Sequence, residues 1–209
     1  MLFRSIREIS RSTITEEEIA AGFVSLFNGK DLTSWVGDTD GYYVKEGNIA
    51  CTPGVGGDLF TEKEYSDFVL RFEFKLTGGA NNGLGIRAPL GQNAAYHGME
   101  LQILENTAEK WADLKAYQYH GSIYGIKPAK RGYLKPVGQW NYEKVIANGN
   151  KITVILNDEI IVDVDIAEAT KDGTMDKQPH PGLFNKSGHI GFLGHGDVVE
   201  FRNIMIKEL

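Results

Sequence analysis

The chain has 209 residues, 42% of them hydrophobic, and is long enough to bury a substantial core within one domain. Its 28 acidic and 22 basic residues give a formal net charge of −6, which excludes the basic surface that binding to nucleic acid requires. No segment reaches the roughly 20 apolar residues that cross a bilayer, so no membrane span is predicted.

The first 22 residues are expected to form an N-terminal extension with a short helix, ahead of one domain over residues 23–209. Thr15-Glu16-Glu17-Glu18 matches a capping box, which marks the start of a helix. Residues 1–14 show no stable period and are interpreted as a mobile extension or an interaction arm. They lack the apolar core of a secretory signal, and the single Cys51 excludes an internal disulfide, so neither feature decides the compartment.

From Phe23 onward the apolar residues recur with the period of two that is typical of strands. The clearest case is residues 67–76, where the even positions are all apolar and Arg71, Glu73 and Lys75 alternate with them. Consecutive hairpins are predicted for residues 139–147, 151–156 and 159–166, which are separated by Asn-Gly and Asn-Asp turns.

Two strands joined by the tight turn Gly194-His195-Gly196-Asp197 end the chain. With the shorter apolar segments, about a dozen strands are expected, and no helices alternate with them. Short strands without interleaved helices predict two antiparallel sheets packed face to face. The predicted fold class is therefore all-β, a jelly-roll sandwich of two antiparallel sheets with a concave groove.

Glu100 and Gln102 form the densest polar pair on an otherwise apolar strand, residues 98–106. They share one face of the strand, and Glu105 falls on the opposite face unless a bulge re-aims it. A pair of carboxylates across a groove is what cleavage of a glycosidic bond requires. The alternative is that these polar residues decorate a solvated face of the sheet.

Arg87 ends a Gly-rich segment and could bind sugar hydroxyls or a carbonyl oxygen, or it could be a surface arginine after a turn. Aromatic residues at expected loop positions include Tyr119 and Trp140, and flat rings suit a sugar site, although about half of them are expected to pack in the core or rim. His120 and His195 are candidate acids or bases because imidazole titrates near neutral pH, although a structural role is more common.

No cofactor and no metal ligand is predicted, and a divalent cation stays compatible with the site. Asp38-Thr39-Asp40-Gly41 resembles a fragment of a calcium loop but lacks the closing Glu, so it is interpreted as a turn. The chain has no serine, histidine and aspartate in triad order, no phosphate-binding loop and no paired cysteines.

Residues 23–35, FVSLFNGKDLTSW, resemble the start of the 3-keto-disaccharide hydrolase domain family. Five further similar blocks follow in family order, at residues 65–70, 81–87, 98–104, 139–141 and 188–204. The resemblance implies a concanavalin-like jelly roll that hydrolyses disaccharides or glycosides whose sugar is oxidised at carbon 3. It also implies a carbohydrate substrate and a periplasmic or secreted location.

The related laminarinase-type hydrolases carry Glu-x-Asp-x-x-Glu on their catalytic strand, and the similar stretch here is Glu100-x-Gln102-x-x-Glu105. Gln102 cannot ionise, which disfavours a standard double displacement. A ketone at carbon 3 acidifies the hydrogen at carbon 2, so a single base suffices: the enolate expels the aglycone from carbon 1, and water adds afterwards.

On this hypothesis Glu100 or His195 takes the proton, and Arg87 and Gln102 stabilise the developing oxyanion. Tyr119 or His120 assists the leaving group. The remaining residues expected to contact the substrate are Asn82, Glu105 and Trp140.

Two other functions are compatible with the sequence. A non-catalytic carbohydrate-binding module on the same fold would bind glycans without forming a product. An adhesion or assembly sandwich would use residues 1–22 to dock on a neighbour. The sequence does not indicate the oligomeric state.

Overall fold

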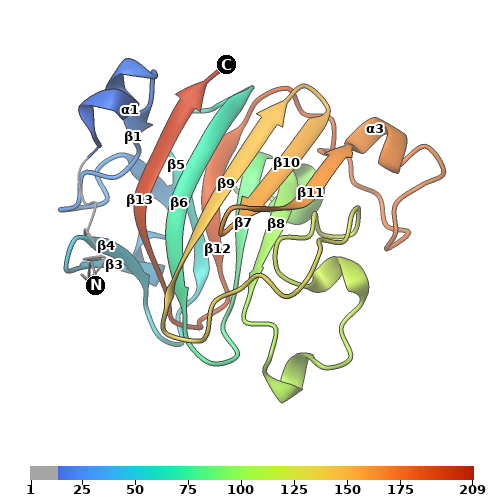
Figure 1. Cartoon of the computed structure of the whole chain (residues 1–209), viewed down its shortest axis with the longest axis horizontal. Helices are drawn as coiled ribbons and strands as arrows, with labels where there is room; N and C mark the ends of the chain where they lie inside the picture. The colour runs from blue at the N-terminus through green and yellow to red at the C-terminus, as the bar shows by residue number, and fades with distance from the viewer. Residues whose placement is uncertain (1–13) are drawn as a thin grey trace, which may run out of the picture.

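The computed structural model describes residues 14–209, which form two antiparallel sheets packed face to face (Figure 1). In the larger sheet the strand order is β11-β10-β9-β6-β13-β4-β3, with β1 paired to β13, and in the smaller sheet it is β2-β5-β12-β7-β8. This architecture confirms the predicted two-sheet sandwich. The larger sheet contains β1 (Val24–Ser25), β3 (Tyr42–Lys45), β4 (Asn48–Cys51), β6 (Phe68–Leu76), β9 (Trp140–Asn148), β10 (Lys151–Leu156), β11 (Glu159–Asp165) and β13 (Val199–Glu208). The smaller sheet contains β2 (Trp35–Gly37), β5 (Gly57–Thr61), β7 (Asn81–Ala88), β8 (Met99–Leu104) and β12 (His189–Gly194).

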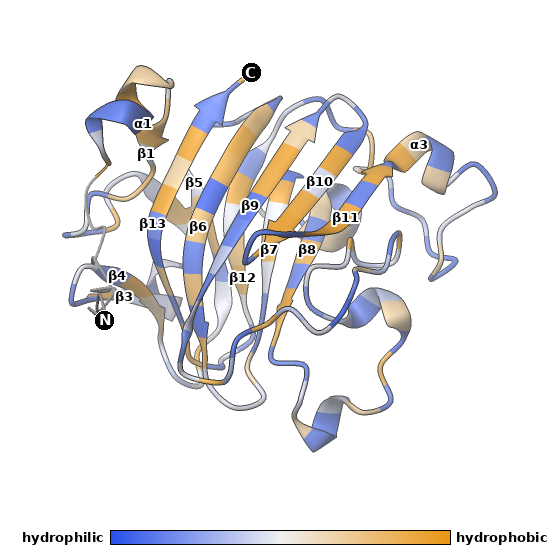
Figure 2. Cartoon of the chain, in the orientation of Figure 1, coloured by the Kyte–Doolittle hydropathy of each residue, from blue (hydrophilic) through white to orange (hydrophobic). Residues whose placement is uncertain are grey.

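The alternation of apolar and polar residues decides which face of each strand is buried. In β6 every second side chain, from Phe68 to Leu76, is buried, and the polar side chains between them are half-buried on the outer face, as predicted. The same alternation is visible along β6 and β9 in Figure 2. The inner faces of both sheets therefore supply the core.

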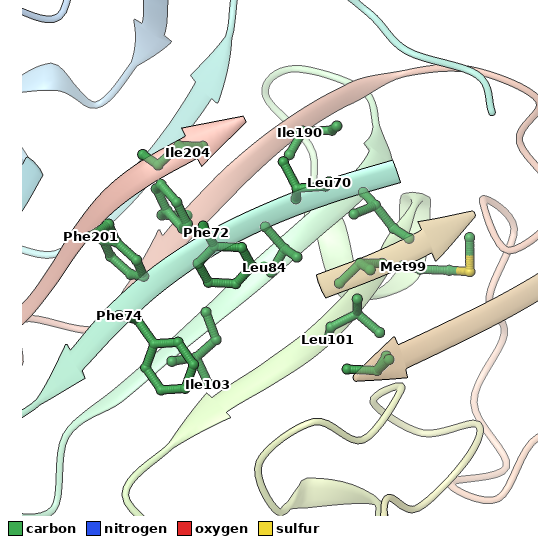
Figure 3. Packing of buried hydrophobic residues seen from close by; sticks show 14 of the residues in the cluster. Leu70, Phe72, Phe74, Leu84, Met99, Leu101, Ile103, Ile190, Phe201 and Ile204 are labelled. Carbon is green, nitrogen blue, oxygen red and sulfur yellow. The ribbon is translucent and has the colours of Figure 1, made fainter. Parts of the chain in front are cut away.

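Aromatic residues pack the centre of the core between the sheets. Phe192 of β12 stacks on Phe201 of β13 with ring centroids 3.7 Å apart, and Phe72 of β6 meets Phe192 edge-on at 5.9 Å. Figure 3 shows Phe72 and Phe74 facing Leu84 and Ile103 of the opposite sheet. This packing fixes the inner faces of β7 and β8, so the side chains at alternate positions on these strands point outward.

The hairpins β9-β10 and β10-β11 form at the turns that the sequence predicts. Gly149 has φ of 56°, and Asn157 and Asp158 have φ of 49° and 73°, so these residues adopt the left-handed conformation that the turns require. One of the shorter segments counted among the expected strands, residues 120–124, does not form a strand, because Ile123 makes only isolated bridges with Leu101 and Lys127.

The helices are short and peripheral. Helix α1 (Glu16–Ala20) starts at Thr15 with both hydrogen bonds of the predicted capping box. The others are α2 (Ala94–His97), α3 (Ile166–Ala169) and the 3-10 turns η1 (Thr39–Gly41), η2 (Glu109–Trp111) and η3 (Ala116–Gln118). Across residues 14–209, none of the helices has the length and apolar character needed to cross a membrane. The mobile extension or interaction arm expected from the sequence lies, at positions 1–13, outside the described residues.

Strand β8 is the last strand of the smaller sheet. Its free edge is covered by the following loop: Gly121 N donates to Gln102 O (2.7 Å), Gln102 N to Ser122 O (3.0 Å), and Tyr124 N to Glu100 O (2.9 Å). The loop therefore lies beside the outward side chains of β8 and can build one wall of a site there.

Candidate active site

A cavity of about 290 Å³ lies on the outer face of the smaller sheet, over β7 and β8. Its floor contains Glu100, Gln102 and Leu104 of β8, with Asn81 of β7 beside them. Its walls come from the segment before β8, from the loop after it and from the turn after β12: Asn93, Ala95, Tyr96, Trp111, Leu114, Gln118, Tyr124 and His195. The two polar residues predicted to share one face of β8 thus line one cavity.

Gly83 of β7 makes room for Glu100. Gly83 and Gly85 lie opposite Gln102 and Glu100 in the β7-β8 register. A Cβ atom placed on Gly83 would come within 2.3 Å of Glu100 Oε1, so the carboxylate lies across the bare backbone of β7. Any side chain at position 83 would therefore displace the carboxyl group of Glu100.

Glu100 is 8% exposed, and no other residue donates a hydrogen bond to its side chain among the described residues. Burial raises its pKa to about 7, and the negative charge of Asp58 adds to the effect. The carboxyl group therefore changes between acid and base near neutral pH. A group with this property in a cavity is a candidate general base.

Two further titratable residues lie at the β12 side of Glu100. Asp58 of β5 is half-buried, and burial together with Asp38 raises its pKa, while His195 opposes this shift. His195 is exposed at the rim of the cavity. The rim thus carries an imidazole, the floor holds Glu100, and Asp58 acts on both through its charge without lining the cavity.

Two amide oxygens on the floor lack a partner. The buried atoms Gln102 Oε1 and Asn81 Oδ1 accept no hydrogen bond in the described part of the chain. Asn93 is oriented at the wall, since its Oδ1 accepts from Ala95 N (3.0 Å), which leaves its NH2 group available. Buried acceptors without donors cost free energy unless a ligand supplies the donors, so the floor is suited to hydroxyl groups.

The wall aromatics are held by contacts behind them. Tyr124 OH accepts from Gln118 Nε2 (3.2 Å), and Trp111 Nε1 donates to Gly79 O (3.1 Å). The Tyr96 ring lies 4.9 Å from that of His180. Burial and the neighbouring Tyr124 raise the pKa of Tyr96, so its hydroxyl remains a hydrogen-bond donor at neutral pH. The aromatic residues that reach this cavity are Tyr96, Trp111 and Tyr124.

Arg87 does not reach the cavity, so its expected place in the groove is wrong. It is 2% exposed and donates to Ser66 O (2.9 Å), Gly149 O (2.8 Å) and Asp67 Oδ1 (2.7 Å). The reason is the backbone conformation: Arg87 has φ of 49°, a left-handed conformation that breaks the alternation of β7. Its guanidinium ties β7 to the β9-β10 turn.

We expect Arg87→Ala to lower the free energy of unfolding by about 2 kcal/mol, because three hydrogen bonds of a charged donor are lost while the half-exposed Asp67 can hydrate. Urea unfolding measures the change, and ligand binding to the folded protein at low temperature should stay as in the wild type. A variant of unchanged stability that no longer binds ligand would return Arg87 to the site.

Three other expected contacts also lie elsewhere. Asn82 is fully buried and faces inward, with its Nδ2 3.5 Å from Cys51 Sγ. Tyr119 is buried and donates to the carbonyl oxygens of Trp111 and Ala112 (3.1 and 3.2 Å). Trp140 lies on the outer face of the larger sheet, where Arg202 and Lys75 cover its ring. The alternation along β7 and β9 places Asn82 and Trp140 away from Glu100, and the two hydrogen bonds of Tyr119 hold its side chain elsewhere.

Glu105 and His120 occupy the other side of β8. Glu105 falls on the opposite face from Glu100, as the unbulged alternation predicts, and accepts from Gly79 N and Thr107 N. His120 is buried between the sheets, with Nε2 3.1 Å from Glu143 Oε2 and Nδ1 accepting from Leu104 N (3.3 Å). Neither side chain can touch a ligand on Glu100.

Within residues 14–209, no group of three or more His, Cys, Asp or Glu side chains is placed to hold a metal ion. Glu100 and His195 are the cavity residues of these types. A divalent cation therefore stays an expectation from the sequence.

Comparison with known proteins assigns the chain to a family. The family model of the 3-keto-alpha-glucoside-1,2-lyase-like domain matches residues 22–207. The chain belongs to this family. A 3-keto-disaccharide hydrolase of Bacteroides thetaiotaomicron is 27% identical over 231 aligned residues, which cover 91% of this chain and 79% of that protein. These matches confirm the family that the sequence blocks resemble.

Solved structures show the same architecture as this member of the 3-keto-alpha-glucoside-1,2-lyase-like family. A Parabacteroides distasonis protein provisionally named a glycosyl hydrolase is 27% identical, has a TM-score of 0.82, and is matched over 95% of this chain and 99% of its own. The carbohydrate-binding module CBM66 of Bacillus subtilis is 15% identical with a TM-score of 0.55, over 86% and 98% of the two chains. The latter likeness concerns the fold alone, which is the predicted jelly-roll sandwich.

Proposed function

We propose that this protein cleaves glycosides whose sugar carries a ketone at carbon 3, and that Glu100 acts as the base. The observation that carries the proposal is a nearly buried carboxyl group with a pKa of about 7 on the floor of a cavity lined by aromatic rings and amides. The name of the B. thetaiotaomicron relative supports the substrate class.

The single carboxylate of the cavity favours elimination over displacement. Retaining glycosidases, which form a covalent intermediate, and inverting glycosidases, which do not, both need two carboxyl groups flanking the glycosidic bond. Among the described residues that line the cavity, Glu100 is the only carboxylate. A substrate whose carbon 2 hydrogen is acidified by a neighbouring ketone needs only one base, so the site and this substrate match.

The first step breaks the bond between carbon 2 and its hydrogen. The ionised Glu100 carboxylate takes the proton, and the electron pair delocalises onto the oxygen at carbon 3 as an enolate. Tyr96 OH and the amide NH2 group of Gln102 are donors of this cavity that would stabilise the enolate oxygen. Gln102 Oε1, which accepts no hydrogen bond from the described residues, would accept one from a sugar hydroxyl.

The second step breaks the bond between carbon 1 and the glycosidic oxygen. The enolate electrons form the double bond between carbons 1 and 2, and the leaving oxygen takes a proton. His195, which is exposed at the rim, would supply that proton and regain one from solvent. Water added across the double bond then completes a net hydrolysis.

A test follows the hydrogen at carbon 2. The protein is incubated in D2O with a 3-keto-glucoside, such as 3-keto-trehalose, and products are examined by NMR and mass spectrometry against an incubation without protein. Sugar release with deuterium at carbon 2 of the 3-keto product is expected. Release with the original hydrogen retained would contradict elimination and indicate direct displacement at carbon 1.

The second candidate is a carbohydrate-binding module without catalysis, favoured by the aromatic and amide lining, which would hold a sugar with or without a base. Binding of the 3-keto-glucoside with no product over time would establish this alternative.

A further inference from the structure

We propose a second ligand site at the end of the sandwich, built for an aromatic carboxylate. A hollow of about 680 Å³, here called the end hollow, is bordered by the ends of β6, β8 and β9 and by residues 131–132 and 134–137. Its volume is in the range of small-molecule sites. It lies on the opposite side of β8 from Glu100, so it is separate from the proposed active site.

The end hollow has an aliphatic wall. Leu76, Leu134, Pro136 and Val137 supply apolar surface, and Val137 is 51% exposed. No aromatic side chain lines the hollow among the described residues. Because sugars in protein sites usually stack on aromatic rings, this lining suits an apolar ring better than a pyranose.

Two cations border the same hollow, and neither forms an ion pair with an acidic residue in the part of the chain that the structure describes. The Arg131 guanidinium lies over the ring of Tyr119, with Cζ 3.7 Å from the ring centroid, and makes no hydrogen bond or ion pair in the described chain. Among residues 14–209, Lys135 Nζ donates only to Trp140 O (2.9 Å). In a chain with a net charge of −6, unpaired cations facing a hollow indicate an anionic ligand.

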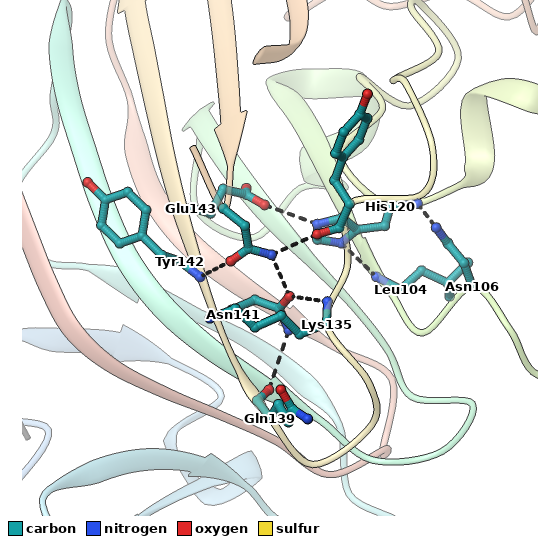
Figure 4. A network of polar contacts seen from close by, with 10 residues as sticks. Leu104, Asn106, His120, Lys135, Gln139, Asn141, Tyr142 and Glu143 are labelled. Carbon is teal, nitrogen blue, oxygen red and sulfur yellow. Dashed lines mark hydrogen bonds and ion pairs between the residues drawn. The ribbon is translucent and has the colours of Figure 1, made fainter. Parts of the chain in front are cut away.

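Hydrogen bonds to the backbone anchor the segment that carries the two cations, whose side chains are exposed. Figure 4 shows the network behind Lys135: its backbone N donates to Asn141 Oδ1 (2.8 Å), which also accepts from Asn157 Nδ2 (2.9 Å). Asn157 Nδ2 also donates to Tyr133 O (2.8 Å). The segment that carries the two charges is thus anchored to the larger sheet, and Tyr119 supports Arg131 from below.

Polar groups at the floor of the hollow would bind the end of the ligand opposite its carboxylate. Asn106 Oδ1 accepts from His120 N (3.0 Å), which leaves its NH2 group available. Glu105 also lines the floor; burial alone would raise its pKa, but hydrogen bonds from Thr107 and from backbone N–H groups together lower it. Asn106 NH2 and Glu105 can bind a phenolic hydroxyl, while Arg131 and Lys135 bind the carboxylate.

The test is a fluorescence titration of the full chain with 6-hydroxy-2-naphthoate, compared with the neutral 6-hydroxy-2-naphthalenemethanol. Saturable binding of the acid is expected. The affinity should fall about tenfold or more in Arg131→Gln and in Lys135→Gln, because each substitution removes a charged donor. Lys130→Gln is the matched control: Lys130 lies in the same segment but pairs with Glu159 (3.3 Å).

Glu100→Gln should leave naphthoate binding unchanged, which separates this site from the proposed active site. Absence of saturable binding, equal affinity for the neutral alcohol, or unchanged affinity in both Arg131→Gln and Lys135→Gln would overturn the proposal. Loss of binding in Glu100→Gln would also overturn it, because the acid would then occupy the cavity on the other face of β8.

Discussion

Replacing Glu100 by Gln should lower the turnover of a 3-keto-glucoside by about 10²–10⁴-fold, the usual contribution of a general base. The amide has the size and shape of the carboxylic acid but cannot take the proton from carbon 2. The cavity keeps its floor, its unpaired amide oxygens and its aromatic walls, so substrate affinity should change little. Initial rates and isothermal calorimetry on the same preparations measure the two quantities.

Glu105→Gln is the matched control for this experiment. Glu105 is a buried carboxylate of the same chain segment, but it faces the end hollow. Turnover per folded molecule should therefore stay close to that of the wild type. If Glu100→Gln kept turnover within tenfold, Glu100 could not be the base, and a loss of affinity without a loss of turnover would leave it a binding role.

The strands could be predicted because each depends on a short-range alternation. β6 shows this, since its burial follows the even positions from Phe68 to Leu76. The same rule placed Glu100 and Gln102 on one face, and this face lines the cavity. It also placed Glu105 on the other face.

The rest of the site could not be predicted, because it depends on long-range packing. Arg87 sits at the end of a strand, and only its left-handed backbone turns it toward Asp67 and the β9-β10 turn. Tyr96 and Tyr124 come to Glu100 through α2 and through the loop over the β8 edge, two segments without a periodic pattern. Asn93 carried one local signal, its position as the N-cap of α2.

Asp58 was missed for a related reason. Asp58 lies on β5, three strands away from β8 in the order β5-β12-β7-β8 of the smaller sheet. It influences Glu100 of β8 through its charge. A pairing order of strands is needed to bring the two residues together, and the sequence alone does not supply that order.

The raised pKa of Glu100 should make stability and turnover change in opposite directions as pH rises. A solvated glutamate has an ordinary pKa of 4.5, and Glu100 in the folded protein has a pKa of about 7, so between these values the folded protein binds more protons than the unfolded chain. Stability from this group is therefore complete below pH 4.5 and is lost as pH rises through 7. Above pH 7 the raised pKa lowers the free energy of unfolding by about 3 kcal/mol relative to its value below pH 4.5.

The measurement is the difference in unfolding free energy between Glu100→Gln and the wild type at several pH values. The contributions of the titratable groups that both proteins share cancel in this difference. Relative to its value at about pH 4, the variant should gain about 3 kcal/mol at about pH 8. Wild-type turnover should rise over the upper part of the same range, because the base must be ionised. A stability difference that stays constant with pH would show that the carboxyl group is not desolvated, and the proposed base would lose the property that suits it to carbon 2.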